Sequence, residues 1–201
     1  MNLSNPLAQF DRMADIFCVD DQPEHVQLEC GSELGGIVAL AFLRPDVEVD
    51  ITTLELSLED PDWWNSQIQA SPQAAFIVLN TRGSKAAGTP TEEEGYGLVA
   101  QERTGADHEL VFESPGVMAN RNFWAAVNQR RNWKMVYLTA GRDQEGNYEA
   151  FYVTNVSVFA DDIIEQSIKS RKRYSGSAKW STSMKPSVPF YAPASVFELS
   201  E

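Results

Sequence analysis

Two stretches of the chain share one pattern of apolar and polar residues. Each begins with an alternating apolar segment, passes a proline, reaches an aromatic pair, and ends with an apolar run and an arginine. The landmarks are Pro61, Trp63-Trp64, Phe76–Leu79 and Arg82 in residues 54–83, and Pro115, Phe123-Trp124, Met135–Leu138 and Arg142 in residues 110–142. In each copy the pattern predicts a strand, a short turn, an aromatic-anchored helix and a second strand. The sequence therefore predicts an internal duplication.

Further strands are predicted from short apolar runs and from alternation. Ile37–Leu43 is a short apolar run with β-branched residues, which is typical of a strand. Residues 47–51 alternate valine or isoleucine with acidic residues, the period of a half-exposed strand. We also expect a strand over 151–158 that Asp161-Asp162 interrupts, and a long polar strand over 165–179.

Helix boundaries come from capping residues and prolines. Asp60, followed by proline, is a typical helix start, and Ser71-Pro72 is a typical stop, so we predict a short helix over Trp63–Ala70. In the second copy Asn120 is the expected cap of a longer helix over Arg121–Arg131. The predicted fold class is mainly β, of sandwich or barrel type, with one main helix and a second short helix.

The expected organisation is one β-rich domain over 25–185 with an extended arm at each end. The N-terminal arm covers 1–24 and the C-terminal tail covers 186–201, both rich in proline or scattered polar residues. The tail carries aromatic residues that must pack either on this same domain or on a neighbouring subunit: Phe190, Tyr191 and Phe197.

The segment Gly83–Gly105 lies between the two copies and reads as a long loop. It combines several glycines with Pro90 and the acidic triplet Glu92-Glu93-Glu94. Long loops in compact domains are usually functional or disordered. Two interpretations stay open: a tip that becomes ordered on contact with a neighbour, or a plain surface excursion.

Charge is distributed unevenly along the 201 residues. The net charge is −13, and residues 1–70 hold 14 acidic against 2 basic residues, a net of −12. The excess serves either as a solubility face, or as a surface that repels nucleic acid or docks on a basic neighbour. General DNA binding is disfavoured because it needs basic side chains that neutralise phosphates.

The two cysteines do not form a recognisable site. Cys18 and Cys30 are 12 positions apart with His25 between them, whereas zinc sites need more ligands at closer spacing. Cys30 ends the alternating run Val26–Cys30, which reads as a strand, so a buried thiol is the favoured interpretation. A disulfide between the two cysteines stays open.

No catalytic, cofactor-binding or metal-binding residue is predicted, and we expect a protein that is not an enzyme. His108, in Asp107-His108-Glu109, lacks a nucleophile partner and reads as a structural or exposed histidine. Gly83-Ser84-Lys85 lacks the first glycine of a phosphate loop. The aromatic pairs of the two copies read as core anchors, with stacking on sugars or bases as the alternative.

One basic cluster stands out in the predicted late strand. It comprises Lys169, Arg171, Lys172, Arg173 and Lys179, with no acidic residue between Glu165 and Glu198. Opposite charges at opposite ends of one chain suit a head-to-tail assembly, in which this strand contacts the acidic part of a neighbour. A solvated strand face is the alternative.

The layout resembles that of phage tail tube proteins. The resemblance covers most of residues 28–182 and is carried by Asn122–Trp133 and the strands that follow it, namely Met135–Thr139, Ala150–Phe159 and Ser170–Ser181. It implies six copies that close a ring by joining their sheets, rings that stack into a tube, and an acidic lumen through which DNA passes without sticking. A neck, tail-terminator, baseplate or decoration component of a virion remains open.

The resemblance also implies partners and surfaces. The partners would be further copies of the chain and other tail proteins, with DNA as cargo, no membrane and no cofactor. Assembly would occur in the host cytoplasm and the product would be part of the virion. The expected inter-subunit loop residues are Glu92, Glu93, Glu94 and Tyr96; the subunit-contacting basic residues are Arg171, Lys172, Arg173 and Lys179; the lumen candidates are Glu48 and Asp50. The competing class is a carbohydrate-binding or adhesion module that uses exposed tryptophans.

Overall fold

The computed structural model describes residues 36–49, 57–94, 101–163, 172–182 and 189–197, all within one compact unit over residues 33–201. This described part is mainly β, as predicted, with strands that all pair antiparallel. The elements in chain order are β1 Ile37–Leu43, the short 3-10 helix η1 Ser57–Glu59, α2 Pro61–Gln69, β2 Ala75–Val78, β3 Arg82–Lys85, β4 Thr89–Glu94, β5 Gln101–Pro115, α3 Val117–Gln129, β6 Trp133–Arg142, β7 Tyr148–Ile163, β8 Arg173–Thr182, β9 Pro189–Ala192 and α4 Ala194–Phe197.

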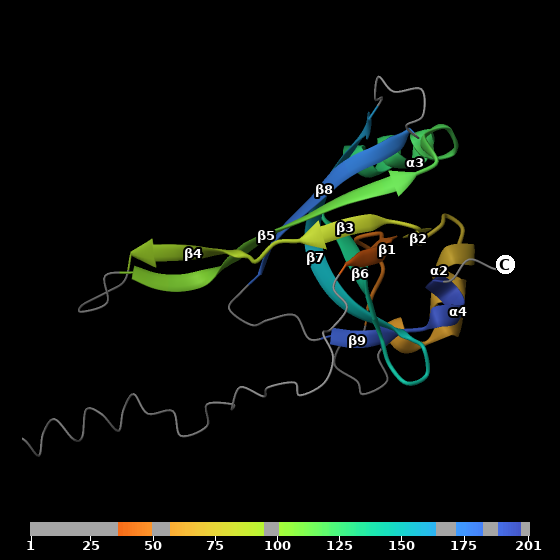
Figure 1. Ribbon diagram of the computed structural model, residues 1–201, viewed down its shortest axis with the longest axis horizontal. Helices are drawn as coiled ribbons and strands as arrows, with labels where there is room; N and C mark the ends of the chain where they lie inside the picture. Colours follow the sequence, from red (N-terminus) through yellow and green to blue (C-terminus); the bar gives the residue numbers. More distant parts are fainter. Residues whose placement is uncertain (1–35, 50–56, 95–100, 164–171, 183–188, 198–201) are drawn as a thin grey trace, which may run out of the picture. The chain divides into compact units, whose positions relative to one another are not determined.

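Six of the strands close a barrel (Figure 1). The hydrogen-bonded order runs β1-β3-β5-β8-β7-β6, and β6 returns to pair with β1 over Leu43 to Ile37. The seam between β1 and β3 is narrow, because only Ile37 and Gly83 face each other there. β2 covers the rest of that edge of β1, while β4 and β9 pair with the margins of β5 and β7. The predicted class is thus realised as a barrel.

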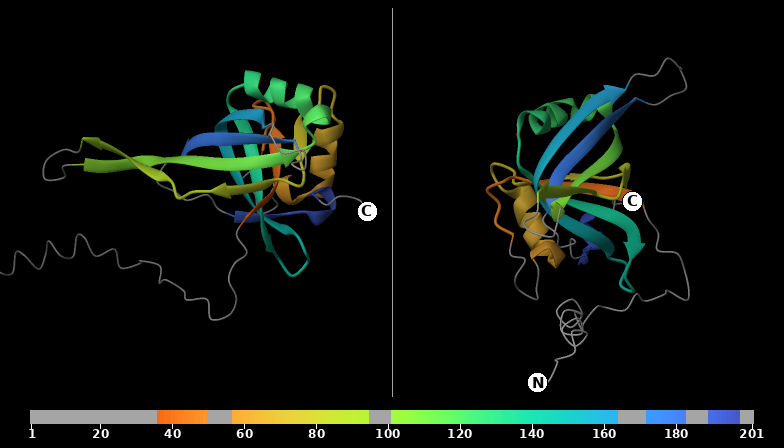
Figure 2. Two further views of the ribbon diagram at one scale, coloured as in Figure 1. Left: turned by 45° about the horizontal axis from the view of Figure 1, so that its top comes forward. Right: turned by 90° about the vertical axis from the view of Figure 1, so that its left-hand side faces the viewer.

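The barrel interior is filled by apolar side chains from every barrel strand except β3, and α3 lies over one end (Figure 2). Trp124 of α3 is 1% exposed and packs on Phe42 and Phe112, with ring centroids 6.0 and 5.4 Å apart. Asn128 fixes the helix to β7: its side chain donates to the carbonyl of Ala160 and accepts from the amide of the same residue. Helix α3 therefore closes the barrel by inserting a tryptophan between strands.

A second core lies on the outer face of the barrel, over β1, β2, β6 and β7. Trp64 of α2 is completely buried there; its indole donates to the carbonyl of Leu58, and its ring packs on Phe197 of α4. Phe190 of β9 also joins this core. The C-terminal aromatics Phe190 and Phe197 thus pack on their own domain, the first of the two alternatives considered for the tail, and the tail contains a strand and a helical turn rather than being extended throughout.

The last strands of the two copies, β2 and β6, lie on opposite edges of β1. The first residues of the two apolar runs, Phe76 and Met135, both pair with Phe42, and both side chains contact the interior core. The helices differ, because Trp64 of α2 belongs to the outer core whereas Trp124 of α3 lies in the interior core. The first elements differ too: the described residues of the first copy form the 3-10 helix η1 where a strand was predicted, whereas the second copy has β5. The two copies thus share the order of helix and strand but not the placement of the helix.

Helix starts follow the prediction in one copy and differ in the other. Asp60 is the N-cap of α2, with its carboxylate accepting from the amide of Asp62 at 2.9 Å. The predicted cap Asn120 is wrong: α3 begins at Val117, after Gly116. Gly116 adopts φ 80°, a left-handed conformation that turns the chain directly from the end of β5 into the helix.

Several predicted boundaries are wrong in the same direction, since the strands are longer than the sequence indicated. Gly83–Gly105 is not a loop, because its described residues form β3, β4 and the first part of β5. Asp161-Asp162 do not interrupt β7, which pairs with β8 through both of them. Both segments carry polar residues because they lie where one or both sheet faces meet solvent.

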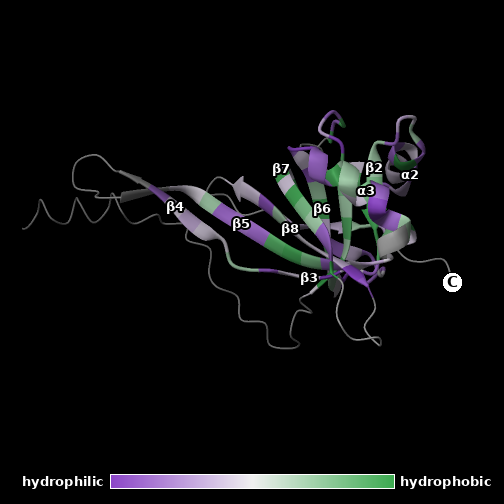
Figure 3. Ribbon diagram, turned by 90° about the horizontal axis from the view of Figure 1, so that it is seen from above, coloured by the Kyte–Doolittle hydropathy of each residue, from purple (hydrophilic) through white to green (hydrophobic). Residues whose placement is uncertain are grey.

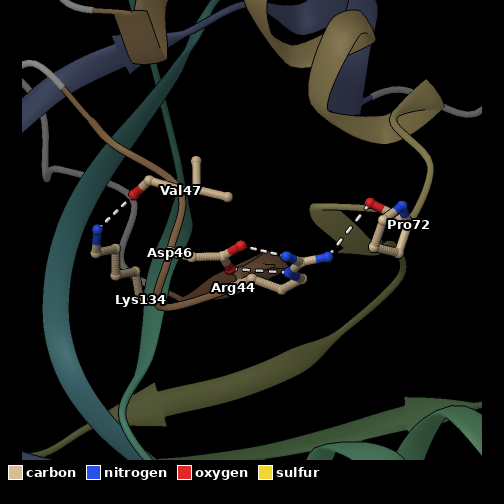
Figure 4. A network of polar contacts seen from close by, with 5 residues as sticks. All are labelled: Arg44, Asp46, Val47, Pro72 and Lys134. Atoms are coloured by element: carbon tan, nitrogen blue, oxygen red, sulfur yellow. Dashed lines mark hydrogen bonds and ion pairs between the residues drawn. The ribbon is translucent and has the colours of Figure 1, made fainter.

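The stretch after β1 is a counterexample. Val47–Val49 is buried, exposed and half-buried in turn, as alternation predicts, yet it is no strand. Arg44 forms an ion pair with Asp46, and its guanidinium reaches the carbonyl of Pro72, while Lys134 donates to the carbonyl of Val47 (Figure 4). These contacts pair the charge of Asp46 and satisfy the carbonyl of Val47 without a strand partner.

We predict that Trp124→Ala lowers the free energy of unfolding by roughly 3–5 kcal/mol, the usual cost of removing a buried tryptophan. Trp63→Ala is the matched control, because Trp63 is only half-buried against Trp64 and should cost clearly less. Urea denaturation followed by circular dichroism measures both. Equal costs would contradict the assignment of Trp124 to the barrel interior.

Candidate functional site

The β4–β5 hairpin extends beyond the barrel. β4 pairs with residues 101–107 of β5, whereas β8 begins to pair with β5 only at Ala106. The outer part of the hairpin is therefore a two-stranded ribbon whose outer edges meet no other strand of the described chain (Figure 1). Figure 3 shows hydrophilic residues along this ribbon and hydrophobic ones where β5 enters the barrel. β5 thus contributes to the barrel core at one end and forms part of an exposed extension at the other.

A histidine stack holds the base of this hairpin. The His108 ring stacks on Trp180 at 5.5 Å, and its Nε2 shares a hydrogen bond with the Thr182 hydroxyl at 2.8 Å. Nδ1 is buried without a hydrogen-bond partner. On the other side, a Cβ at Gly88 would lie 2.4 Å from Cε1 of the ring, so any larger residue at this position would displace the ring. The ring is thus fixed between β8 and the β3–β4 connection.

This packing affects the protonation of His108. Burial lowers its pKa below 6.5, Lys85 lowers it further, and Asp107 opposes the shift. Neutral His108 therefore fits the hairpin base better than the imidazolium, which would bury an N–H at Nδ1 with no acceptor. The predicted role of a structural histidine agrees with this geometry.

The outer face of β5, β8 and β7 is a sheet surface with paired charges. Lys179 and Glu109 face each other in the β5–β8 register and lie 3.2 Å apart, and Arg173 lies 3.1 Å from Glu113. The basic strand predicted from the sequence is thus matched by acidic residues of β5 in the same copy. Arg173 and Lys179, together with these glutamates, therefore form a surface of mixed charge and not a purely basic one.

Two apolar side chains stand on that same face. Val111 is 47% exposed and Phe159 is 62% exposed, and both are aligned with Ser177 of β8, one on each side. A single large apolar side chain on a surface needs no explanation. Here two such side chains lie in one row, between the Lys179–Glu109 and Arg173–Glu113 ion pairs, and together they offer a contact area. No helix of the described chain covers this face (Figure 2).

A cleft runs between β2 and the end of β5. One cavity of about 460 Å³ lies against Phe76, Phe123 and Trp124, with Ser114 and Pro115 on the opposite wall. A second, of about 1050 Å³, shares Ser114 and Pro115 and is lined by Arg82, Lys172 and Arg173, with Glu113 beside them. The cleft exists because β2 and β3 meet β1 in succession, while β5 pairs with β3 and not with β2.

The predicted contact residues are distributed over these features. Glu92, Glu93 and Glu94 all belong to β4, so they lie on a strand of the hairpin and not in a loop as predicted. Lys172 is exposed at the cleft, and Glu48 is exposed in the segment after β1. Tyr96, Arg171 and Asp50 lie outside the described residues, as do Lys169, Cys18, Cys30 and the arm over 1–24.

Sequence reasoning missed the hairpin base and the cleft. Gly88 and His108 are far enough apart that only the strand register brings them together. The alternation of His108 with Leu110 and Phe112 was a signal that His108 faces inward. The cleft had no sequence signal, because it arises from the narrow seam between β1 and β3.

The aromatic pairs are core residues, as predicted. Trp64 and Trp124 are buried, and Trp63 is half-buried with its ring edge-on to Trp64 at 5.2 Å. A ligand-stacking platform needs an exposed ring face, which Trp124 does not offer.

The described residues contain no group of three or more potential metal ligands. Burial raises the pKa of the core phenol Tyr137 to about 12, and Glu149 adds to the effect. Among the described residues, no helix is long and apolar enough to cross a membrane. No family model, curated protein or solved structure matches this chain.

We predict that the free energy of unfolding falls as the pH is lowered from 7.5 to 5, partly through His108. Its folded pKa lies below the unfolded value, so its stabilisation is complete above about 6.5 and is lost as the pH falls towards the folded pKa. In His108→Gln the dependence should be shallower, measured by urea titrations at each pH. His25 is present in both proteins and cancels in the comparison, so equal slopes would contradict the assignment.

Proposed function

We propose that this protein is a structural subunit that assembles with copies of itself, of the phage tail tube type: rings, with six copies as the expected number, that stack into a tube for DNA passage. In this proposal the working partners are further copies and other tail proteins of the virion, assembled in the host cytoplasm. DNA is cargo and not a bound ligand.

The observation that carries the proposal is the hairpin that extends beyond the barrel. A two-stranded ribbon is at best marginally stable alone in water, because it has no third strand and no packed face. Exposed strand edges also pair readily with other chains. Pro90 and the three glutamates of β4 restrict that pairing to a selected partner, since proline removes a donor and the charges repel like edges. Such an element is complete only in an assembly.

The closed barrel changes how a ring would form. Sheets of neighbouring copies cannot join through the barrel strands, because each of these is paired on both edges within one copy. Contacts would use the margins instead: β4, β2, β9 and the exposed face of β5, β8 and β7. The proposal therefore assigns lateral and stacking contacts to these elements, with the barrel as a preformed block.

Charge supports the cargo role of DNA. The net charge of −13 opposes phosphate binding, and the basic residues Lys179 and Arg173 already lie beside glutamates. Glu48, exposed after β1, remains a candidate for a lumen-facing residue, as does Asp50. The alternative of a sugar-binding module is less well supported, because it depends on tryptophans that are buried or half-buried.

The test is assembly of the purified protein. We expect rings or tubes in negative-stain images and high-mass species by size exclusion as the concentration rises. Replacing residues 90–106 with Asn-Gly keeps the Thr89–Asp107 pair at the end of a two-residue turn. This variant should retain the circular dichroism and thermal transition of the barrel and lose stacking.

The control is Asn65→Ser, a neutral change at an exposed residue of α2, which should leave assembly intact. A parent protein that stays monomeric at high concentration, or a hairpin-shortened variant that still forms tubes, would contradict the proposal.

A further inference from the structure

The cleft between β2 and the end of β5 has the dimensions of a missing strand. β2 is four residues long, so its edge extends for about 13 Å at the usual rise per residue. Its only strand partner in the described chain is β1. The opposite wall, Ser114 and Pro115, lies beyond the last residue of β5 that pairs with β3, which is Glu113. Two strand segments thus face the same cavity without pairing with each other.

The edge of β2 presents backbone hydrogen-bonding groups to this cleft. The carbonyl of Ala74 accepts from the amide of Arg44 and therefore points towards β1, while the amide of Ala74 donates to the carbonyl of Gln67. Because backbone groups alternate between the two edges of a strand, Ala75 and Ile77 point theirs away from β1. The side chain of Gln73 donates to the carbonyl of Ala75 at 2.8 Å, in agreement with this direction. Ile77 is left with an amide and a carbonyl at the edge.

The side chains that line the cleft are complementary to an occupant that is apolar at one end and acidic at the other. Phe76 and Phe123 are half-buried, 5.6 Å apart, and line the smaller cavity. Arg82 and Lys172 line the larger cavity, and both are exposed. Neither forms a salt bridge with another described residue. An acidic strand with alternating apolar residues would satisfy all of these groups.

We propose that the occupant is the Val26–Cys30 segment of a second copy of this chain, added as a strand to the edge of β2. Its sequence alternates apolar with polar residues, as an edge-pairing strand with one buried face does. Five strand residues span about 16 Å, which is enough to run along the whole edge of β2. Residues 1–35 hold 7 acidic residues and 1 basic residue, a net charge of −6 that complements Arg82 and Lys172.

The exchange rests on the proposed self-assembly, and it specifies one contact within it. A strand donated by a neighbour joins two copies by backbone pairing without opening either barrel. It also covers the half-buried phenylalanines Phe76 and Phe123, which gain an apolar contact on the cleft side. The segment of one copy would then complete the sheet margin of the next.

The native cysteine of the segment allows a direct test in the full chain. One protein carries Cys18→Ser and keeps Cys30; the other carries Cys18→Ser, Cys30→Ser and Pro115→Cys, which places a thiol on an exposed residue of the cleft. After mixing and mild oxidation, we expect a disulfide between the two proteins, identified by non-reducing electrophoresis and mass spectrometry. Asn65→Cys on α2 replaces Pro115→Cys as the position control and should give only a background yield.

Charge provides the second readout. Arg82→Glu with Lys172→Glu in the cleft protein should lower the yield of the linked species several-fold at low salt, whereas Arg121→Glu, an exposed change on α3 outside the cleft lining, should leave it unchanged. Circular dichroism checks that each variant is folded. A yield equal to that of the Asn65→Cys control would overturn the inference.

A link that forms only within one chain would also overturn it. This outcome is detected as a cross-linked monomer in a protein that carries Cys18→Ser and Pro115→Cys together. The two proposals fail separately: rings or tubes without the link between copies refute the strand exchange alone, and the link without rings or tubes refutes the tube function alone.

Discussion

The pairing of β1 on both of its edges is the constraint on which the structure depends. β6 covers one edge along the whole strand, and β2 and β3 share the other. Four of its seven residues are completely buried, with side chains that alternate between the two cores. Closure of the barrel and the cleft both follow from how this one strand is divided between its neighbours.

The repeated sequence pattern does not give a symmetric molecule. Two helix–strand units flank β1, yet Trp124 of α3 packs in the barrel interior whereas Trp64 of α2 packs on the outside of the barrel. The helix thus closes one end of the barrel in one unit and forms an outer layer in the other. Similar sequence patterns therefore occupy different packing environments in the same fold.

The fold class, the strand over Ile37–Leu43, the cap Asp60 and the burial of the aromatic anchors could be predicted, because each depends on local pattern. The start of α3 could not, since the left-handed Gly116 competes with a good capping residue four positions later. The hairpin could not be told from a loop, because a ribbon exposed on both faces has a polar sequence. The cleft and the stack on His108 depend on register between distant strands, which no single segment encodes.

The continuity of β5 has a mechanical consequence. Its 15 residues run without a break from the exposed ribbon, past His108, to Leu110 and Phe112 in the interior. A force applied to the outer part of the ribbon would therefore travel along one extended backbone, past the packed ring of His108, into the interior core. In the proposed assembly, a neighbour that held the ribbon would thereby also restrain the barrel interior.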